Sequence, residues 1–224
     1  MAIVEFDSRK QLDEYIACQT GNMHLGEGTE GICYCGKDGK AYKVYSEDGY
    51  REFYPIDDIL TKDDFQLQSF AFPETIFTVN GCMEAYTSSL VPQNLFDHEH
   101  LTINGIQNIN FDNLINAYKT MQDDVSQLTK SGIVLSDVPG NILFDGVNLI
   151  VVDTCSYSRD NELENPRFNQ AVIDKALKDT FNKLFEDDAS EGLFVNPNQD
   201  VVPFFRDIED TFKQKVYVNK KVDQ

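Results

Sequence analysis

Two aspartates and one asparagine with the side-chain chemistry of a metal and proton site lie within residues 131–157: Asp137, Asn141 and Asp153. Alternating apolar and polar residues predict strand, polar loop, strand, tight turn and strand, and Asp153 directly follows the apolar run LIVV. Mg²⁺ takes oxygen ligands and is usually held by few protein groups, with water and phosphate oxygens supplying the others. Asn141 and Asp153 could supply that protein share, which would leave Asp137 to act as a base.

The same residues are also common in turns, and for this stretch alone the second interpretation is equally good. Asp, Asn, Pro and Gly favour loops, and Asp145-Gly146 is a hairpin turn signal. The choice between metal chemistry and turn chemistry therefore depends on the elements that precede this stretch.

A glycine-rich segment lies upstream, among three predicted antiparallel strands at about 22–26, 31–36 and 40–45. Gly26, Gly28 and Gly31 form a G-x-G-x-x-G motif. Because the motif joins strand to strand rather than strand to helix, a Rossmann dinucleotide site is disfavoured. A flap over phosphates is the better functional interpretation, with Lys43 on the next strand, although glycines also serve hairpins that touch no ligand.

Further elements follow from residue spacing: helices over 8–18, 56–60 and 110–130, strands over 75–80 and 82–91, and long helices along 168–185 and 202–216. Ser8 is the expected N-cap of the first helix, and Asn80-Gly81 is a strong hairpin signal. The chain is thus predicted to be α+β, with about five antiparallel strands in a region that ends near Pro92.

The charge of the chain narrows the range of partners. Lys and Arg number 19 and Asp and Glu number 38, so the net charge is −19 and the pI is near 4.3. Such a charge repels nucleic-acid phosphates and anionic membranes, so we expect neither as a partner, and basic partners are favoured. Strong acidity also simply keeps a protein in solution.

Five cysteines form an odd set without C-x-x-C spacing: Cys18, Cys33, Cys35, Cys82 and Cys155. This argues against a disulfide scaffold and a structural zinc site, and favours a reducing compartment. The N-terminus has no signal-like apolar stretch and no run approaches the ~18 apolar residues of a membrane span, so cytoplasm is the expected location, with secretion by a signal-independent system left open.

Other candidate groups have simpler interpretations. His98-Glu99-His100 beside Asp97 could ligate a metal, but we expect an ordinary polar loop. Cys33 and Cys35 are expected to be small apolar fillers of a strand, and Cys155 a buried, unreactive thiol.

The order of the motifs resembles that of the protein-kinase-like fold. LGEGTEG at 25–31 is similar to the nucleotide-covering loop, AYKV at 41–44 to the strand with the phosphate-binding lysine, and SLVP at 89–92 to the hinge. SGIVLSDVPGNILF at 131–144 is similar to the catalytic loop, and VVDTC at 151–155 lies at the position of the metal-binding DFG segment.

The resemblance implies a fold and a nucleotide site. The fold would have two lobes, an antiparallel five-stranded N-lobe over residues 1–92 and a mainly helical, truncated C-lobe over 93–224. Lys43 would bind the α and β phosphates of ATP, Asn141 and Asp153 would hold Mg²⁺, and Asp137 would orient or deprotonate the accepting hydroxyl. Backbone groups would cover the triphosphate and meet the adenine, at Gly26, Gly28 and Gly31 and at Ser89, Leu90 and Val91 respectively.

The chain departs from the family pattern at several positions. Leu135-Ser136 replace His-Arg before the catalytic aspartate, Pro139 replaces a lysine, and Thr154-Cys155 replace Phe-Gly. Asp137 and Asn141 are four positions apart where the family has five. The acidic partner of Lys43 stays open among three candidates, Glu52, Asp57 and Asp58.

We therefore expect an ATP- and Mg²⁺-dependent kinase that phosphorylates a protein Ser/Thr hydroxyl. Two alternatives remain: a pseudokinase that serves as a binding module, and a small-molecule phosphotransferase of the aminoglycoside type. In each catalytic case the acceptor is expected to be basic, because the chain is acidic.

Overall fold

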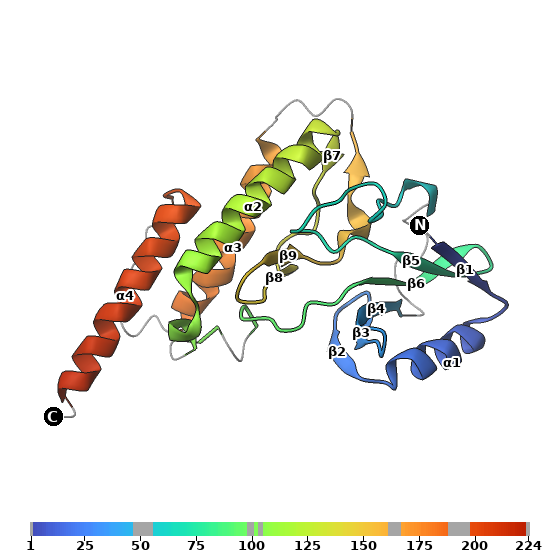
Figure 1. Ribbon diagram of the computed structural model, residues 1–224, viewed down its shortest axis with the longest axis horizontal. Helices are drawn as coiled ribbons and strands as arrows, with labels where there is room; N and C mark the ends of the chain where they lie inside the picture. Colours follow the sequence, from blue (N-terminus) through green and yellow to red (C-terminus); the bar gives the residue numbers. More distant parts are fainter. Residues whose placement is uncertain are drawn as a thin grey trace. The chain divides into compact units, whose positions relative to one another are not determined.

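A computed structural model describes residues 2–46, 56–97, 101–102, 105–160, 167–187 and 198–222, without the side chains of 183–187 and 213–222. In this part of the chain the fold is α+β, as predicted, with one mixed six-stranded sheet and four α-helices (Figure 1). The chain divides into two compact units: Met1–Val91 with Val152–Asp160, and Pro92–Val151 with Asn161–Gln224. Asp153 therefore belongs to the first unit.

The first unit is built on the six-stranded sheet, in the order β1-β5-β6-β4-β3-β2. Its strands are β1 (Ala2–Phe6), β2 (His24–Glu27), β3 (Gly31–Cys35), β4 (Lys40–Tyr45), β5 (Thr75–Val79) and β6 (Cys82–Ser89). The five predicted strands are confirmed, but a five-stranded antiparallel sheet was wrong, because β1 adds a sixth strand and pairs with β5 in parallel. β1 escapes prediction because it is an edge strand with mostly exposed side chains, so it lacks alternation of apolar and polar residues.

Helix α1 (Arg9–Thr20) covers one face of this sheet, and its predicted N-cap is confirmed. The Ser8 side chain accepts a hydrogen bond from the amide of Gln11, and Gly21 ends the helix in the left-handed conformation with φ of 60°. The core on this side gathers buried residues of α1 and three strands, β4, β5 and β6: Leu12, Ile16, Tyr42, Val44, Phe77, Val79 and Ala85.

A second core lies on the other face of the sheet: Tyr45, Ile59, Ile76, Met83, Tyr86 and Cys155. The 3₁₀ turns η1 (Ile56–Asp58) and η3 (Thr154–Ser156) and the short strand β10 (Ser158–Arg159) also belong to the first unit. Because successive side chains of a strand point to opposite faces, Lys43 lies on the same side of β4 as Tyr45, away from α1.

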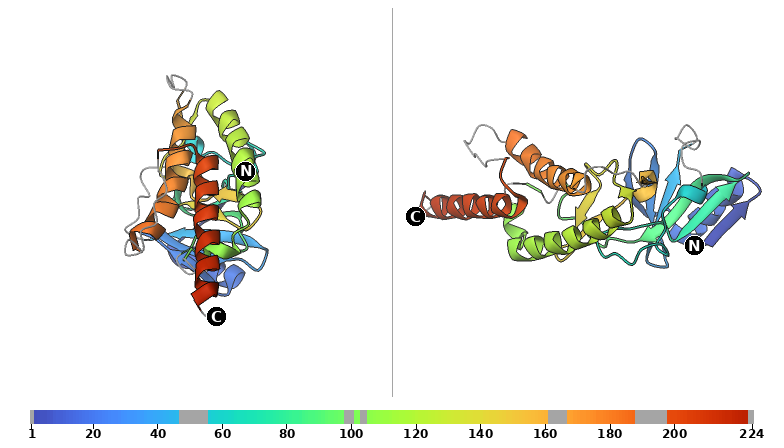
Figure 2. Two further views of the ribbon diagram at one scale, coloured as in Figure 1. Left: turned by 90° about the vertical axis from the view of Figure 1, so that its left-hand side faces the viewer. Right: turned by 90° about the horizontal axis from the view of Figure 1, so that it is seen from above.

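The second unit is mainly helical, with α2 (Phe111–Lys130), α3 (Phe168–Asp187) and α4 (Val201–Val222) in mutual contact (Figure 2). The three long helices are thus confirmed. Aromatic rings fill the space between them, and Phe181, Phe204 and Phe205 are fully buried. A 3₁₀ turn η2 (Ile106–Asn108), the short strand β7 (Ile133–Val134) and the hairpin of β8 (Ile142–Phe144) and β9 (Leu149–Val151) complete the unit. Among the described helices, none has the length and apolar character needed to cross a membrane.

Candidate functional site

Lys43 is the centre of a charged group in the first unit. Its ammonium forms ion pairs with Glu30, at 3.1 Å from Oε2, and with Oδ2 of Asp153, and lies 5.2 Å from the centre of the Tyr45 ring. The side chain of Lys43 is only 10% exposed, and those of Glu30 and Asp153 are about one-fifth exposed. We call Lys43, Glu30, Asp153 and Tyr86 the Lys43 cluster.

Four separate segments supply the Lys43 cluster. Lys43 is paired across the sheet with Tyr86 of β6, whose hydroxyl donates to Oδ1 of Asp153 at 3.3 Å. Glu30 stands in the connection between β2 and β3, and its carbonyl oxygen accepts the amide of Ser46 at 2.9 Å. Asp153, immediately before η3, adopts the left-handed conformation with φ of 60°. Hydrogen bonds therefore hold both carboxylates against the lysine.

Burial shifts the pKa of Lys43, Tyr86 and the neighbouring Cys155, and for Lys43 the nearby carboxylates oppose it. Burial lowers the pKa of Lys43, but the attraction of Asp153 and Glu30 outweighs it, so the pKa is raised above its ordinary value and the lysine stays charged. Burial raises the pKa of Tyr86 far above its ordinary value, so its hydroxyl remains a hydrogen-bond donor to Asp153. Burial likewise raises the pKa of the Cys155 thiol to about 12, which agrees with the predicted unreactive thiol.

The three glycines of the motif have different structural settings. A Cβ on Gly31 would lie 2.1 Å from the carbonyl oxygen of Val44, so this glycine is required by close strand packing. A Cβ on Gly26 or Gly28 would meet no atom within 4 Å. Of the three motif glycines, Gly26 and Gly28 therefore have no packing reason, and they are the ones at which a ligand could approach the backbone.

The predicted hinge residues follow the end of β6 in the first unit. Ser89 is the last residue of β6, and its hydroxyl donates to Glu74 Oε1 at 3.1 Å. Leu90 and Val91 come next and are partly exposed. The hydroxyl of Ser89 is thus part of a surface network, while Leu90 and Val91 keep backbone groups outside the strand pairing.

Asp137 and Asn141 lie in the second unit, in the loop between β7 and β8 that we call the Asp137 loop (residues 137–141). The side-chain Nδ2 of Asn141 donates to the carbonyl oxygen of Asp137 at 2.7 Å, and the backbone N–H of Asn141 donates to the carbonyl oxygen of Val138 at 3.0 Å. Asp137 is exposed and has φ of 51°, and Gly140 also has positive φ, 84°. Because Nδ2 of Asn141 faces Asp137, its Oδ1 is turned away and accepts no bond from the described residues.

Asn169 on α3 fixes the strand that leads into the Asp137 loop. Its buried amide donates to the carbonyl of Ile133 at 2.7 Å and to the hydroxyl of Thr129 at 2.9 Å, and it accepts the amide of Leu135 at 3.0 Å. All four residues belong to the second unit. One side chain thus satisfies two backbone groups that β-strand pairing of a two-residue strand cannot satisfy alone.

Four described non-glycine residues have positive φ, and two are the candidate aspartates. Asn22 and Asn80 stand next to glycines in turns, where asparagine is a usual choice. Asp137 and Asp153 are instead two of the residues predicted to do chemistry, one in each unit. Strained backbone of this kind concentrates at functional positions.

Glu30 and Asn169 were missed by the sequence reasoning. Glu30, inside the glycine motif, is the ion-pair partner of Lys43, whereas Asp57 and Asp58 are exposed and Glu52 lies outside the described residues. Glu30 directly precedes β3, the strand that pairs with the Lys43 strand β4, so β3–β4 pairing could have suggested it. Nothing in the sequence distinguishes Asn169 from a surface asparagine. His98-Glu99-His100 also lies outside the described residues.

The donor atoms fit the groups that a nucleotide site needs. An ammonium has three N–H donors, and two carboxylates use two of those of Lys43, which leaves one for a phosphate oxygen. The carboxylate of Asp153 and the outward Oδ1 of Asn141 are oxygen ligands suited to Mg²⁺. Within the described residues, no three His, Cys, Asp or Glu side chains gather as a metal site of their own.

No protein-family model matches the chain, and no curated protein matches it in sequence.

Proposed function

We propose that the chain is an ATP- and Mg²⁺-dependent kinase-like protein that transfers the γ-phosphoryl group to a protein Ser/Thr hydroxyl. The observation that carries the proposal is the ion pair between Lys43 and Asp153, residues 110 positions apart in the chain. These are the two positions at which the resemblance to the protein-kinase-like fold requires a phosphate-binding lysine and a metal-binding aspartate. The left-handed conformation of both Asp153 and Asp137 adds support.

Each side chain has a role that its position allows. Lys43 donates an N–H to a phosphate oxygen, and the open backbone at Gly26 and Gly28 accommodates the phosphates. Asp153 and Asn141 would supply oxygens to Mg²⁺, and the bound ion would neutralise charge on the phosphate oxygens. The oxygen of the acceptor hydroxyl attacks the γ-phosphorus, and Asp137 accepts the proton that this hydroxyl loses. At the same time the bond between the γ-phosphorus and the bridging oxygen breaks, and ADP leaves with that oxygen.

Glu30 favours one alternative, a nucleotide-binding pseudokinase. Its carboxylate already neutralises Lys43 from within the glycine-rich connection, so a phosphate must compete with it for the ammonium. A small-molecule phosphotransferase would use the same residues on a different acceptor. Binding and transfer must therefore be measured separately.

The first test is thermal unfolding of the full chain with ATP, in the presence and absence of Mg²⁺. A ligand bound only to the folded state at 100 times its dissociation constant adds about 2.7 kcal/mol, which shifts the melting temperature measurably. Absence of a shift with saturating Mg-ATP would remove both catalytic proposals.

The second test is transfer of label from γ-labelled ATP to basic proteins and to the chain itself. We expect Asp137→Asn to lower the rate by about 10²–10⁴-fold, because a general base is lost. Asp123→Asn, on the exposed side of α2, removes the same charge outside the site and should leave the rate unchanged. Equal label incorporation by wild type and Asp137→Asn would exclude Asp137 as the base, and a shift without any transfer would favour the pseudokinase.

A further inference from the structure

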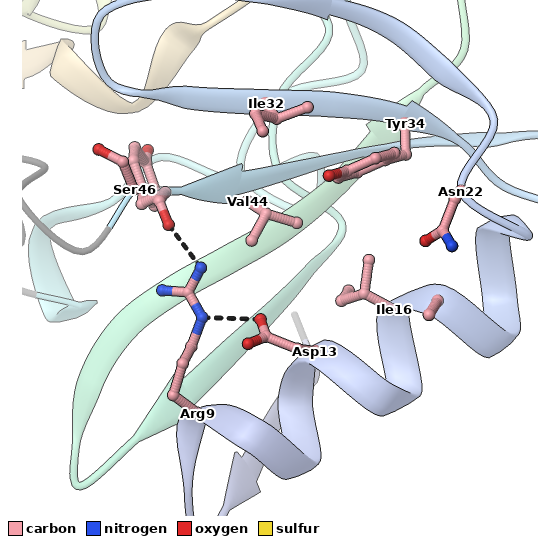
Figure 3. Close-up of a pocket in the computed structure, with 10 residues that line it drawn as sticks. Arg9, Asp13, Ile16, Asn22, Ile32, Tyr34, Val44 and Ser46 are labelled. Atoms are coloured by element: carbon pink, nitrogen blue, oxygen red, sulfur yellow. Dashed lines mark hydrogen bonds and ion pairs between the residues drawn. The ribbon is translucent and has the colours of Figure 1, made fainter.

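A cavity of about 350 Å³ lies between α1 and the sheet of the first unit, on the side of β4 away from Lys43 (Figure 3). Its lining includes Arg9, Asp13 and Ile16 of α1 and Ile32, Tyr34 and Val44 of β3 and β4. Pockets that hold small molecules usually measure about 300–1,000 Å³, so this one suits a compact ligand. Nothing in the proposed kinase reaction uses it.

The floor of the cavity is apolar. Ile16 and Val44 belong to the buried core beneath it, and Ile32 and Tyr34 flank them on β3. Figure 3 shows the hydroxyl end of Tyr34 directed toward the centre of the cavity and the amide of Asn22 directed toward α1. An apolar body with a small number of polar groups at its edge would match this surface.

The charged side chains at the mouth of the cavity determine which ligand charge is favoured. Arg9 donates to Oδ1 of Asp13 at 2.8 Å, to Glu84 at 2.6 Å and to the carbonyl of Tyr45 at 2.8 Å. One guanidinium thus faces two carboxylates, so Arg9 has no unpaired charge to offer an anionic ligand. Oδ2 of Asp13 accepts no bond from the described residues, and the Asp13 side chain is 54% exposed.

From this geometry we infer that the cavity binds an organic ammonium with an aromatic or branched apolar body. The body packs on Ile16, Ile32 and Val44, and the ammonium pairs with the second oxygen of Asp13. An anion of the same shape is disfavoured, because Arg9 already pairs with the carboxylates of Asp13 and Glu84. The net charge of −19 attracts the same class of ligand over a longer range.

Three indole probes test the assignment on the full-length chain: tryptamine, which is cationic, 3-ethylindole, which is neutral, and indole-3-propionate, which is anionic. We expect saturable amide shifts in two-dimensional NMR spectra at residues 9–17, 32–34 and 44–46, with tryptamine binding most tightly. Tighter or equal binding of the propionate would overturn the assignment of an ammonium. Absence of saturable shifts at these residues with every probe would overturn the site.

Two variants locate the contacts. Asp13→Asn should weaken tryptamine about fivefold and leave 3-ethylindole unchanged, because a partly exposed ion pair is worth about 1 kcal/mol at most. Glu14→Gln, which removes the neighbouring charge of the same helix on its exposed side, is the matched control and should change neither. Ala17→Phe should fill the cavity and abolish binding of all probes, with its melting curve as a check of folding. Unchanged affinity in both Asp13→Asn and Ala17→Phe would place the probes elsewhere.

Discussion

The Lys43 cluster and the Asp137 loop are held in shape by different forces. In the Lys43 cluster, side-chain charges from three distant segments bind one another in a partly buried setting. In the Asp137 loop, the side chain and the backbone N–H of Asn141 donate to carbonyl oxygens of the same loop, and Asn169 anchors the strand that precedes it. The first region is thus maintained by electrostatics between side chains and the second by local hydrogen bonding.

This difference predicts opposite responses to substitution. Removing one charge from the Lys43 cluster leaves the remaining charges without a partner in a partly buried place. This lowers the free energy of unfolding. Removing the charge of Asp137 leaves the backbone bonds of its loop intact, because Asn141 binds the Asp137 carbonyl. Both regions contain residues needed for the proposed chemistry. We expect loss of a charge to lower stability strongly only in the Lys43 cluster.

Lys43→Met should produce the largest loss of stability, about 3–5 kcal/mol in the free energy of unfolding, because Glu30 and Asp153 would face each other without a cation. Urea denaturation at neutral pH measures it. Lys62→Met is the matched control: Lys62 pairs with Glu74 at 2.5 Å, but its side chain is 51% exposed, so the cost should be at most about 1 kcal/mol.

Neutralising both carboxylates sharpens the same test. In a background of Glu30→Gln and Asp153→Asn, the added cost of Lys43→Met should fall to about 1 kcal/mol or less, since no unpaired buried charge remains. If Lys43→Met costs no more than Lys62→Met in the wild-type background, electrostatics does not hold the cluster together.

Asn169→Ala should have the next largest effect, about 2 kcal/mol, because it leaves the amide of Leu135 and the carbonyl of Ile133 unpaired in a buried place. Hydrogen exchange of the Leu135 amide should accelerate. Asn169→Asp keeps the acceptor for Leu135 and should protect that amide better than Asn169→Ala does.

Asn116→Ala on the exposed side of α2 is the control and should stay within about 0.5 kcal/mol of wild type. Equal exchange of the Leu135 amide in wild type and Asn169→Ala would show that the loop is fixed without α3.

Local signals in the sequence predicted most elements of both units. Asn80-Gly81 forms the expected hairpin turn with φ of 52° and 75°, and the apolar stripe of α2 gives its bounds almost to the residue. β1 was missed because its side chains are exposed at the sheet edge. Periodicity reports burial on one face, so an element without such a face leaves no pattern.

The candidate site was predictable in its residue types but less so in its contacts. The order of motifs singled out Lys43 and Asp153, and the structure pairs them. Glu30 was overlooked because ion pairs depend on strand pairing, which spacing alone does not give. Gly31 was assigned to phosphate binding, but its place against the Val44 carbonyl supplies a sufficient packing reason.

The smallest effect concerns the left-handed backbone of Asp137, which has φ of 51°. Asp137→Ala should be about 1 kcal/mol less stable than Asp137→Gly, because a Cβ without a local hydrogen bond disfavours this conformation. Both variants lose the carboxylate equally, so their difference measures backbone strain alone. The same pair at Asp153, with φ of 60°, should differ by a similar amount although both variants lose the ion pair with Lys43. Urea denaturation of the four variants separates the contribution of backbone strain from that of the lost charge. Equal stability of the Ala and Gly variants at position 137 would mean that the backbone of Asp137 is not held in the left-handed conformation in solution. Charge alone would then distinguish the two regions.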